Sequence, residues 1–383
     1  MPIICKQQLF EYKITDNFNT VVAEWSNNLP NYHHLLYHDL LAIENSRLQN
    51  LKQQYVSIYK KRMFIGCLLI QIVKIDLKDI KFESQFRKYL VKLLISKNDS
   101  IIICGNILRV NQEGYFFKDS NNIIYLKDIL LEIKNIIKKD QNIFGILLKD
   151  SEVNFNKKLI SCNPFISFNT DATMRLEIRK NWQTFSNYEQ SLAKKYKQRL
   201  HKIIQSGTNI ERRELNLQSI EIYKIEIENL YLQLVQKQSF NLAKLNKNYF
   251  VEMKRNLGEK FMIVGYFLDG KMLAFSSYIF YPNNEMEIHY IGTETEKNKS
   301  FQLYFNILYD GLKIAIDRKQ TKLELGRTAK EAKSNMGAMA EINQNYAWLN
   351  SKVLQYLTQS IIRCFDQNDF NNWTQRNPFK EIN

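Results

Sequence analysis

Two groups of polar side chains in the second half of the chain have the types and spacing of an acid–base site. The first lies in EMEIHYIG, residues 285–292, where Glu287 and His289 stand two positions apart and Tyr290 follows directly. Because side chains alternate along a strand, Glu287 and His289 should share one face, where one could act as a base and the other as its partner. Tyr290 should point to the opposite face. A half-exposed strand face without any catalytic role is the alternative interpretation.

The second group is cationic. The segment LELGRTAKEAKSNMGA, residues 323–338, leaves an apolar stretch through Gly326 and then places Arg327, Lys330 and Lys333 within seven positions. If the residues after Arg327 begin a helix, Lys330 and Lys333 lie three apart on one face. With Arg327 they could then hold a phosphate group or an oxyanion. Runs of charge also form solvated loops, so a cationic loop without a ligand is the alternative.

Together the two groups suit acyl transfer to an amine. The amine must be neutral when it attacks, so its proton needs an acceptor, and the carbonyl oxygen needs a donor that stabilises its developing negative charge. We expect Glu287 or His289 to relay the proton, and Arg327 with Lys333 to hold a phosphate-bearing donor or acceptor.

Other polar residues are weaker candidates. Asn106 ends an apolar segment and either contacts substrate or caps a turn. Tyr304 either faces an acyl pocket or packs in the core. His34 and His38 are four positions apart, a spacing that suits a metal ion, but the sequence offers no evident third ligand, so we expect no metal site.

Hydrophobic periodicity and turn signals predict the elements that must position these residues. In the first half we expect two helices within 19–49, a hairpin over 55–75, a helix over 82–97, a strand over 99–107, a helix over 125–139 and a strand over 143–149. In the second half we expect helices over 185–207 and 220–238, a hairpin over 260–281 turning at Asp269-Gly270, a strand over 285–292, a helix over 302–319 and a strand over 322–326. The repeated order predicts one mixed α/β unit used twice.

The two units should span residues 1–165 and 166–383. An apolar helix over 346–365 should end the second unit and either cover its sheet or form an interface.

The 383-residue chain is basic, with 54 Lys+Arg against 39 Asp+Glu and a formal net charge of +15. Ten of these cations fall within residues 175–213. A surplus of this size favours polyanionic partners such as RNA, anionic lipid surfaces or phosphorylated substrates.

Cysteine usage and hydropathy indicate a cytoplasmic protein. The five cysteines are scattered and lack metal-binding spacing, as expected for reduced core residues. The N-terminal segment MPIICKQQLFEYK does not have the pattern of a signal peptide, and no stretch is long and apolar enough to cross a membrane.

Several stretches resemble the GNAT acyltransferase fold, and more closely the FemAB-like branch, in which one chain fuses two GNAT units. MRLEIRKNWQTFSNYEQSLAKKYKQRLHK (174–202) is similar to the start of the second unit, and residues 289–338 resemble its strand–helix–strand core with the basic loop that follows. ICGNILRVNQEGYFF (103–117) is similar to a Gly-Asn strand end in bacterial GNAT-like proteins associated with peptidoglycan biosynthesis. The resemblance implies two tandem GNAT-like units, with the chemistry in the second.

The resemblance also implies an acyl donor, which is a CoA thioester in GNAT enzymes and aminoacyl-tRNA in well-known FemAB-like proteins. GNAT enzymes bind the pyrophosphate of CoA at a Gln/Arg-x-x-Gly-x-Gly/Ala loop. This chain has GTETEKNKSFQ there, with a single glycine, and Lys297 and Lys299 could partly compensate.

The resemblance therefore predicts an N-acyltransferase or aminoacyltransferase acting on a small-molecule or peptide amine in a cleft between the two units. It makes tRNA a candidate partner and a basic residue after the strand, Lys333 or Arg327, a binding residue. Two alternatives stay open: a non-catalytic tandem GNAT that serves as a scaffold or sensor, and a basic RNA-binding protein. Oligomeric state is not predicted.

Overall fold

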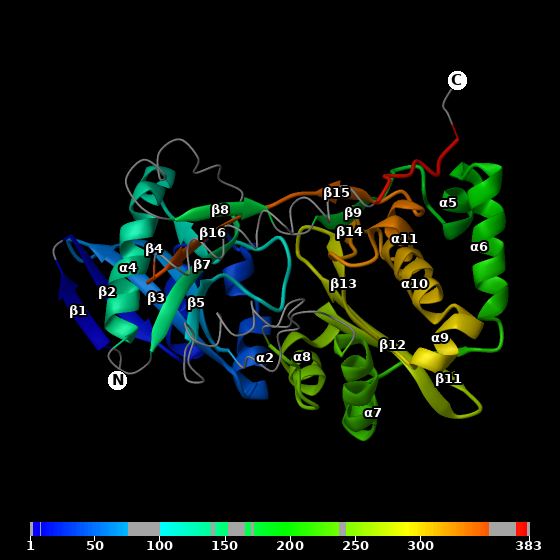
Figure 1. Cartoon of the computed structure of the whole chain (residues 1–383), viewed down its shortest axis with the longest axis horizontal. Helices are drawn as coiled ribbons and strands as arrows, with labels where there is room; N and C mark the ends of the chain where they lie inside the picture. Colours follow the sequence, from blue (N-terminus) through cyan, green and yellow to red (C-terminus); the bar gives the residue numbers. More distant parts are fainter. Residues whose placement is uncertain are drawn as a thin grey trace. The chain divides into compact units, whose positions relative to one another are not determined.

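The computed structural model describes residues 3–7, 9–75, 100–138, 142–151, 165–169, 172–236, 243–351 and 373–380. The chain forms two compact units, each with one mixed sheet (Figure 1). Unit 1 comprises residues 1–170, 239–244 and 343–368, and unit 2 comprises residues 171–238, 245–342 and 369–383. The predicted mixed α/β class is confirmed.

The sheet of unit 1 has the order β1-β2-β3-β4-β5-β7-β16-β8, with β6 paired to β4. Of these described strands, only β5 and β7 run parallel to each other. The strands are β1 (Ile3–Gln7), β2 (Phe10–Thr15), β3 (Leu51–Lys60), β4 (Met63–Lys74), β5 (Ser100–Cys104), β6 (Tyr115–Phe117), β7 (Ile143–Ser151), β8 (Ile166–Asn169) and β16 (Gln344–Leu349).

Helices cover both faces of this sheet. The α-helices are α1 (Val22–Ser26), α2 (Asp39–Ser46) and α4 (Leu126–Ile137), and the 3-10 helices are η1 (Phe18–Thr20), η2 (His34–Leu36) and η4 (Ser120–Tyr125). Figure 1 shows α4 lying across the sheet, where Leu126, Ile129 and Ile133 are buried against strand residues such as Val56. Trp25, from α1, packs in a second cluster with Tyr55, the neighbour of Val56. The strands are therefore buried on both faces.

Most predicted elements of the first half are confirmed. The hairpin predicted over 55–75 is β3–β4, and α4 and β7 lie where a helix and a strand were expected. The helix predicted over 82–97 lies outside the described residues.

The predicted helix over 346–365 is wrong at its start, because residues 344–349 form β16. This strand pairs with both β7 and β8 and belongs with unit 1. Its apolar residues satisfied a helical period in the sequence, but sheet pairing decided their conformation. The rest of the predicted helix lies outside the described residues.

The sheet of unit 2 has the order β10-β11-β12-β13-β14-β9-β15, in which β13 and β14 run parallel. Its strands are β9 (Thr173–Glu177), β10 (Glu211–Glu214), β11 (Phe261–Leu268), β12 (Lys271–Phe280), β13 (Glu285–Thr293), β14 (Lys322–Glu324) and β15 (Met339–Glu341). Its helices are α5 (Phe185–Ser191), α6 (Lys194–Ser206), α7 (Leu217–Val235), α8 (Tyr249–Leu257), η7 (Gly258–Lys260), α9 (Thr295–Phe301), α10 (Leu303–Asp317) and α11 (Lys330–Ser334).

The central strand β13 is covered by α10 on one face and by α7 on the other. A Cβ on Gly311 of α10 would lie 2.6 Å from the Cδ1 atom of Ile288, so α10 sits directly on this strand. On the other face, a Cβ on Gly292 would lie 2.9 Å from the carbonyl carbon of Leu230 in α7. In Figure 1, α7 and α10 flank the second sheet in the same way.

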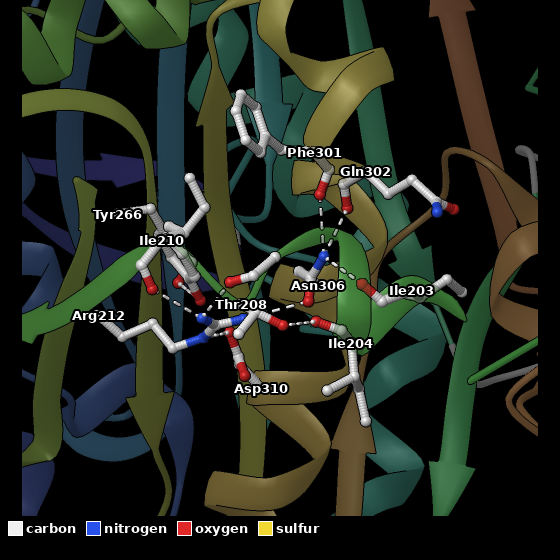
Figure 2. A network of polar contacts seen from close by, with 12 residues as sticks. Ile203, Ile204, Thr208, Ile210, Arg212, Tyr266, Phe301, Gln302, Asn306 and Asp310 are labelled. Atoms are coloured by element: carbon white, nitrogen blue, oxygen red, sulfur yellow. Dashed lines mark hydrogen bonds and ion pairs between the residues drawn. The ribbon is translucent and has the colours of Figure 1, made fainter. Parts of the chain in front are cut away.

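A polar network around the buried Asn306 ties α10 to α6 and β10 (Figure 2). The Asn306 Nδ2 atom donates to the carbonyl oxygens of Ile203, at 2.9 Å, and Phe301, at 3.0 Å. Its Oδ1 accepts from Arg212 Nη2 at 3.1 Å, and Arg212 Nε donates to Asp310 Oδ2 at 2.8 Å. Asn306 and the Ser206 hydroxyl thereby both donate to carbonyl groups at the ends of α6 and α9.

Asn306→Leu should destabilise unit 2 by about 2–4 kcal/mol, because it leaves buried carbonyl groups and Arg212 without this partner. Urea unfolding should show a lower midpoint with an unchanged slope. Asn229→Leu on the exposed side of α7 is the matched control and should change stability by less than about 0.5 kcal/mol. Equal midpoints for the two variants would contradict the role assigned to Asn306.

A membrane-crossing helix is not found in the described ranges, where each helix is too short or too polar to span a bilayer.

Candidate active site

Charged side chains form a row across three neighbouring strands of unit 2. Glu287 on β13 pairs in register with Glu324 on β14, and Glu324 pairs with Arg175 on β9. Residues that pair directly point to the same face of a sheet, so the three side chains lie side by side. Leu323 and Met286 point to the other face, into the core beneath α10. Glu287 and Glu324 are only 4% and 7% exposed, so this row places two carboxylates in the interior.

The carboxyl group of Glu324 has a pKa close to neutral pH. Burial, with a smaller contribution from the nearby Glu287, raises its pKa to about 7 against the opposing effects of Arg175 and the Gly326 N–H. Arg175 Nε lies 3.3 Å from Glu324 Oε2, and the Gly326 N–H donates to Oε1 with an N–O distance of 3.0 Å. A carboxyl group with this pKa is ionised in a useful fraction of molecules and can also hold a proton, as a general base must.

A chain of hydrogen bonds extends from Glu287. Its Oε1 lies 2.9 Å from His289 Nδ1, and its Oε2 accepts from the Tyr281 hydroxyl at 2.6 Å. The other ring nitrogen of His289, Nε2, lies 2.7 Å from the hydroxyl of Tyr249 on α8. The His289 side chain is fully buried. The structure therefore brings Glu287 and His289 together as the strand alternation predicts, and Tyr249 and Tyr281 join them.

Tyr290 lies beside His289, and the prediction that it points to the opposite face is wrong. The β12–β13 ladder shifts register at Ser277, which faces both His289 and Tyr290. The Ser277 hydroxyl bonds both the N–H and the carbonyl of Tyr290, at 3.0 and 3.2 Å. The extra residue of this β-bulge breaks the alternation. As a result the His289 and Tyr290 ring centroids are 4.4 Å apart, and both rings contact Tyr249.

The cationic group divides into one buried and two more accessible residues. Lys333 is 2% exposed, and its Nζ donates to the Gly326 carbonyl at 3.2 Å. Gly326 thus bonds Glu324 through its N–H and Lys333 through its carbonyl, which links the two candidate groups. Lys330 begins α11 and its Nζ lies 5.9 Å from the centre of the Trp373 ring, and Arg327 is half-buried.

The remaining candidates of unit 2 lie on α9 and α10. The Tyr304 hydroxyl bonds the Thr328 side chain in the loop after β14, and burial raises its pKa to about 12. Tyr304 therefore touches the loop that carries the cationic group. Lys297 and Lys299 are both exposed on α9.

The loop after β13 does not fit the usual pyrophosphate cradle. A Cβ on Gly292 would lie 2.3 Å from the Phe275 ring, so this glycine accommodates packing. The first N–H of α9, that of Thr295, donates to Gln233 Oε1 of α7 at 3.1 Å. Two glutamates, Glu294 and Glu296, stand at the same helix start, where they would repel a phosphate.

Asn106 belongs to a polar cluster of unit 1. Its Oδ1 accepts from the Leu108 N–H at 3.0 Å, which is the geometry of a turn cap. Of the histidines, His34 bonds the Glu113 carbonyl oxygen, and its burial lowers its pKa to about 4. Within the described ranges, no three His, Cys, Asp or Glu side chains are grouped to hold a metal ion.

Sequence reasoning missed Glu324, Arg175, Tyr249 and Tyr281. Glu324 had a detectable signal, because it is an acidic residue between Leu323 and Leu325 in an apolar strand, and such a residue is buried only when its surroundings compensate its charge. Tyr249 and Tyr281 had no comparable signal, since tyrosine is common in cores.

The sequence matches no established protein family and no curated protein. By structure, the chain is similar to a tandem GNAT protein from the clavulanic acid biosynthesis pathway, at 8% identity over 89% of this chain and 99% of that one, with a TM-score of 0.50. The chain has the tandem GNAT fold.

Two further solved structures are similar to this tandem GNAT chain. A conserved protein of unknown function from Bacteroides thetaiotaomicron VPI-5482 has a TM-score of 0.51 at 12% identity, over 88% of this chain and 99% of that one. FemX has a TM-score of 0.49 at 11% identity, over 85% and 97% of the two chains. The resemblance inferred from the sequence is confirmed at the level of fold.

Proposed function

We propose that unit 2 transfers an acyl or aminoacyl group to an amine, with Glu324 as the general base. The observation that carries this proposal is the buried Glu324 carboxyl group, whose pKa is about 7 and which lies next to Glu287 in the sheet. A free amine has a pKa near 10 and is mostly protonated at neutral pH, so an acceptor for its proton makes it a nucleophile.

The reaction forms a C–N bond to the amine and breaks the C–S or C–O bond of the donor. Glu324 takes the proton of the attacking amine and returns it to the leaving thiolate or alkoxide. Glu287, His289 and Tyr249 form the hydrogen-bonded chain beside it, which can redistribute that proton. The Tyr290 ring packs against the rings of His289 and Tyr249.

Cations around the loop after β14 would hold the phosphate-bearing part of the donor. Arg327 and Lys330 are the accessible members of this group, while Lys333 orients Gly326 from inside. Lys297 and Lys299 on α9 are further candidates for a carrier phosphate. The tandem GNAT fold and the net charge of +15 support both donor classes, a CoA thioester and aminoacyl-tRNA. The acceptor would be a small-molecule or peptide amine.

A donor-release assay tests the proposal. The full chain is incubated with acetyl-CoA, a long-chain acyl-CoA or bulk aminoacyl-tRNA, with and without a mixture of primary amines, and free thiol or deacylated tRNA is measured. Amine-stimulated release from one donor is the expected result. Absence of release from all three would overturn the transferase and favour the scaffold.

Lys333→Met should lower turnover at least about tenfold, because it removes the charged one of two donors to the Gly326 carbonyl, the other being the Met174 N–H, while keeping a side chain of similar length. The same release assay measures the change, alongside the thermal midpoint of each variant. Lys313→Met removes an exposed charge from α10 of the same unit and is the matched control. Equal turnover of both variants would remove Lys333 from the site.

A further inference from the structure

The described residues nearest the C-terminus, 373–380, lie along the loop that carries the cationic group, and we call them the C-terminal strap. The Gln375 side chain donates to the Ala338 carbonyl at 2.8 Å. Arg376 Nη2 lies 3.0 Å from Glu331 Oε1. The strap also places Trp373 beside Lys330. In Figure 1 the strap is the red segment that runs past α11 and α5.

The strap is anchored firmly at its far end. The Pro378 carbonyl accepts from the Ala193 N–H at 2.9 Å, and the Lys380 N–H donates to the carbonyl of Ser191, the last residue of α5, at 3.0 Å. Between them, the Phe379 ring lies 5.5 Å from the Trp182 ring and 3.9 Å from the Arg179 guanidinium. Backbone pairing and a stacked cation together fix the position of Phe379.

The Phe379 ring packs directly against Gly337, at the end of the loop that carries the cationic group. Gly337 has a φ of +97°, and a Cβ there would lie 2.3 Å from the Cζ atom of Phe379. Only glycine permits both this backbone conformation and this close approach. The Tyr188 hydroxyl holds the preceding residue, donating to the Met336 carbonyl at 3.1 Å. The loop and Phe379 are therefore built to fit each other.

The helix α11 needs such support. It has only five residues, and a helix of this length is unstable without tertiary contacts. The turns on either side of it are set by Ala329 and Gly337, which have positive φ values of 53° and 97°. Lys333 reaches Gly326 from this short helix, and the Gly326 N–H in turn bonds Glu324.

We propose that the C-terminal strap is a positioning element of the transfer site: by holding α11 it keeps Lys333 on the Gly326 carbonyl and the Gly326 N–H on Glu324. The effect on catalysis rests on the proposed function, whereas the effect on the loop and on Glu324 does not. Phe379 is a positioning residue because it acts through Gly337 and α11.

Release of the strap has a specific electrostatic consequence. The groups that face Glu324 are Arg175 on β9, Glu287 on β13 and the Gly326 N–H, with Lys333 of α11 behind the latter. Arg175 and the N–H lower the pKa of Glu324, and Glu287 raises it. Losing the N–H bond removes a stabilising contact of the carboxylate, so the pKa of Glu324 moves upward.

The closing experiment uses the full chain with Phe379→Ala and needs no substrate. Hydrogen exchange of the amides in 326–338 should accelerate at least about tenfold, while exchange of β11–β13 stays unchanged. Infrared titration of the carboxyl groups, with Glu324→Gln as the assignment reference, should place the Glu324 transition at higher pH than in the wild type.

Phe267→Ala is the matched control, because Phe267 also stacks with an arginine, Arg213, at 4.4 Å, and lies in β11 of the same unit. It is 1% exposed, so its loss should cost at least as much stability as the loss of Phe379. Unchanged exchange of 326–338 in Phe379→Ala, or equal acceleration in both variants, would overturn the proposal.

A milder variant covers the case in which Phe379→Ala fails to fold. Arg376→Ala removes the contact with Glu331 and leaves the Phe379 anchor in place, so faster exchange confined to α11 supports the proposal and unchanged exchange overturns it. If the strap passes these tests but no donor is used, the proposed function fails and the positioning role stands.

Discussion

Glu324→Gln should lower the rate of amine acylation by about 10²–10⁴-fold, the usual contribution of a positioned general base. In the wild type, activity should fall as the pH drops below about 7, because protonation of Glu324 removes the base. The variant should lose this acidic limb. The measurement is kcat/KM between pH 5 and pH 9 for wild type and variant, with the donor identified by the release assay.

The same substitution makes a stability prediction with a definite sign. Burial raises the pKa of Glu324 in the folded chain above its unfolded value, so ionising it costs stability as the pH rises from about 5 to above 7. Glu324→Gln should therefore gain stability relative to wild type over that window, by at most about 3 kcal/mol. Urea unfolding at pH 5 and pH 8 measures the difference.

Glu177→Gln is the matched control, since Glu177 is an exposed glutamate on β9 of the same sheet. It should leave unchanged both the pH dependence of kcat/KM and the difference in the free energy of unfolding between pH 5 and pH 8. A Glu324→Gln variant that keeps its acidic limb would transfer the role of base to Glu287 or His289, which lie in the same hydrogen-bonded group.

Arg109→Leu should destabilise unit 1 by about 3–5 kcal/mol. Arg109 Nη1 lies 2.7 Å from Asp39 Oδ2, and the two side chains are 0% and 2% exposed. Removing one member of a buried ion pair leaves the other charge in the interior without its counter-charge. Such a loss is among the costliest single substitutions. Urea unfolding, followed by a probe in unit 1, measures the loss.

A double variant separates the cost of leaving Asp39 unpaired from the loss of the other contacts of Arg109. Asp39→Leu combined with Arg109→Leu should recover a large part of the stability, because no charge from this pair then stays buried. Lys52→Leu is the control: the Lys52–Asp16 pair is exposed, with Nζ and Oδ2 3.9 Å apart, and its loss should cost less than about 1 kcal/mol. A double variant as unstable as Arg109→Leu alone would show that other contacts of Arg109 dominate.

Much of the fold could be predicted because its signals are local. The Asp269-Gly270 turn specifies the β11–β12 hairpin, and apolar periodicity locates α10 and β13 nearly to their ends. The β16 segment was mispredicted because its apolar run fits either period, and only pairing with β7 and β8 makes it a strand.

In the candidate site, too, some features follow from local sequence and others from contacts between distant segments. Strand alternation is a local property, so it correctly places Glu287 beside His289. The bulge at Ser277 turns Tyr290 to their side, and a bulge depends on the neighbouring strand. Glu324 gains its raised pKa from burial, and its facing groups arrive from β13 and β9, elements far apart in the sequence.

The sequence by itself therefore determined the mixed α/β class, the repeated order of elements, the net positive charge and the pairing of Glu287 with His289, because each is set by composition or by neighbours along the chain. The tertiary structure decided which carboxyl group titrates near neutral pH, which lysine is buried and what holds its loop. Burial, strand register and the packing of the C-terminal strap are contacts between distant segments, and no local pattern specifies them.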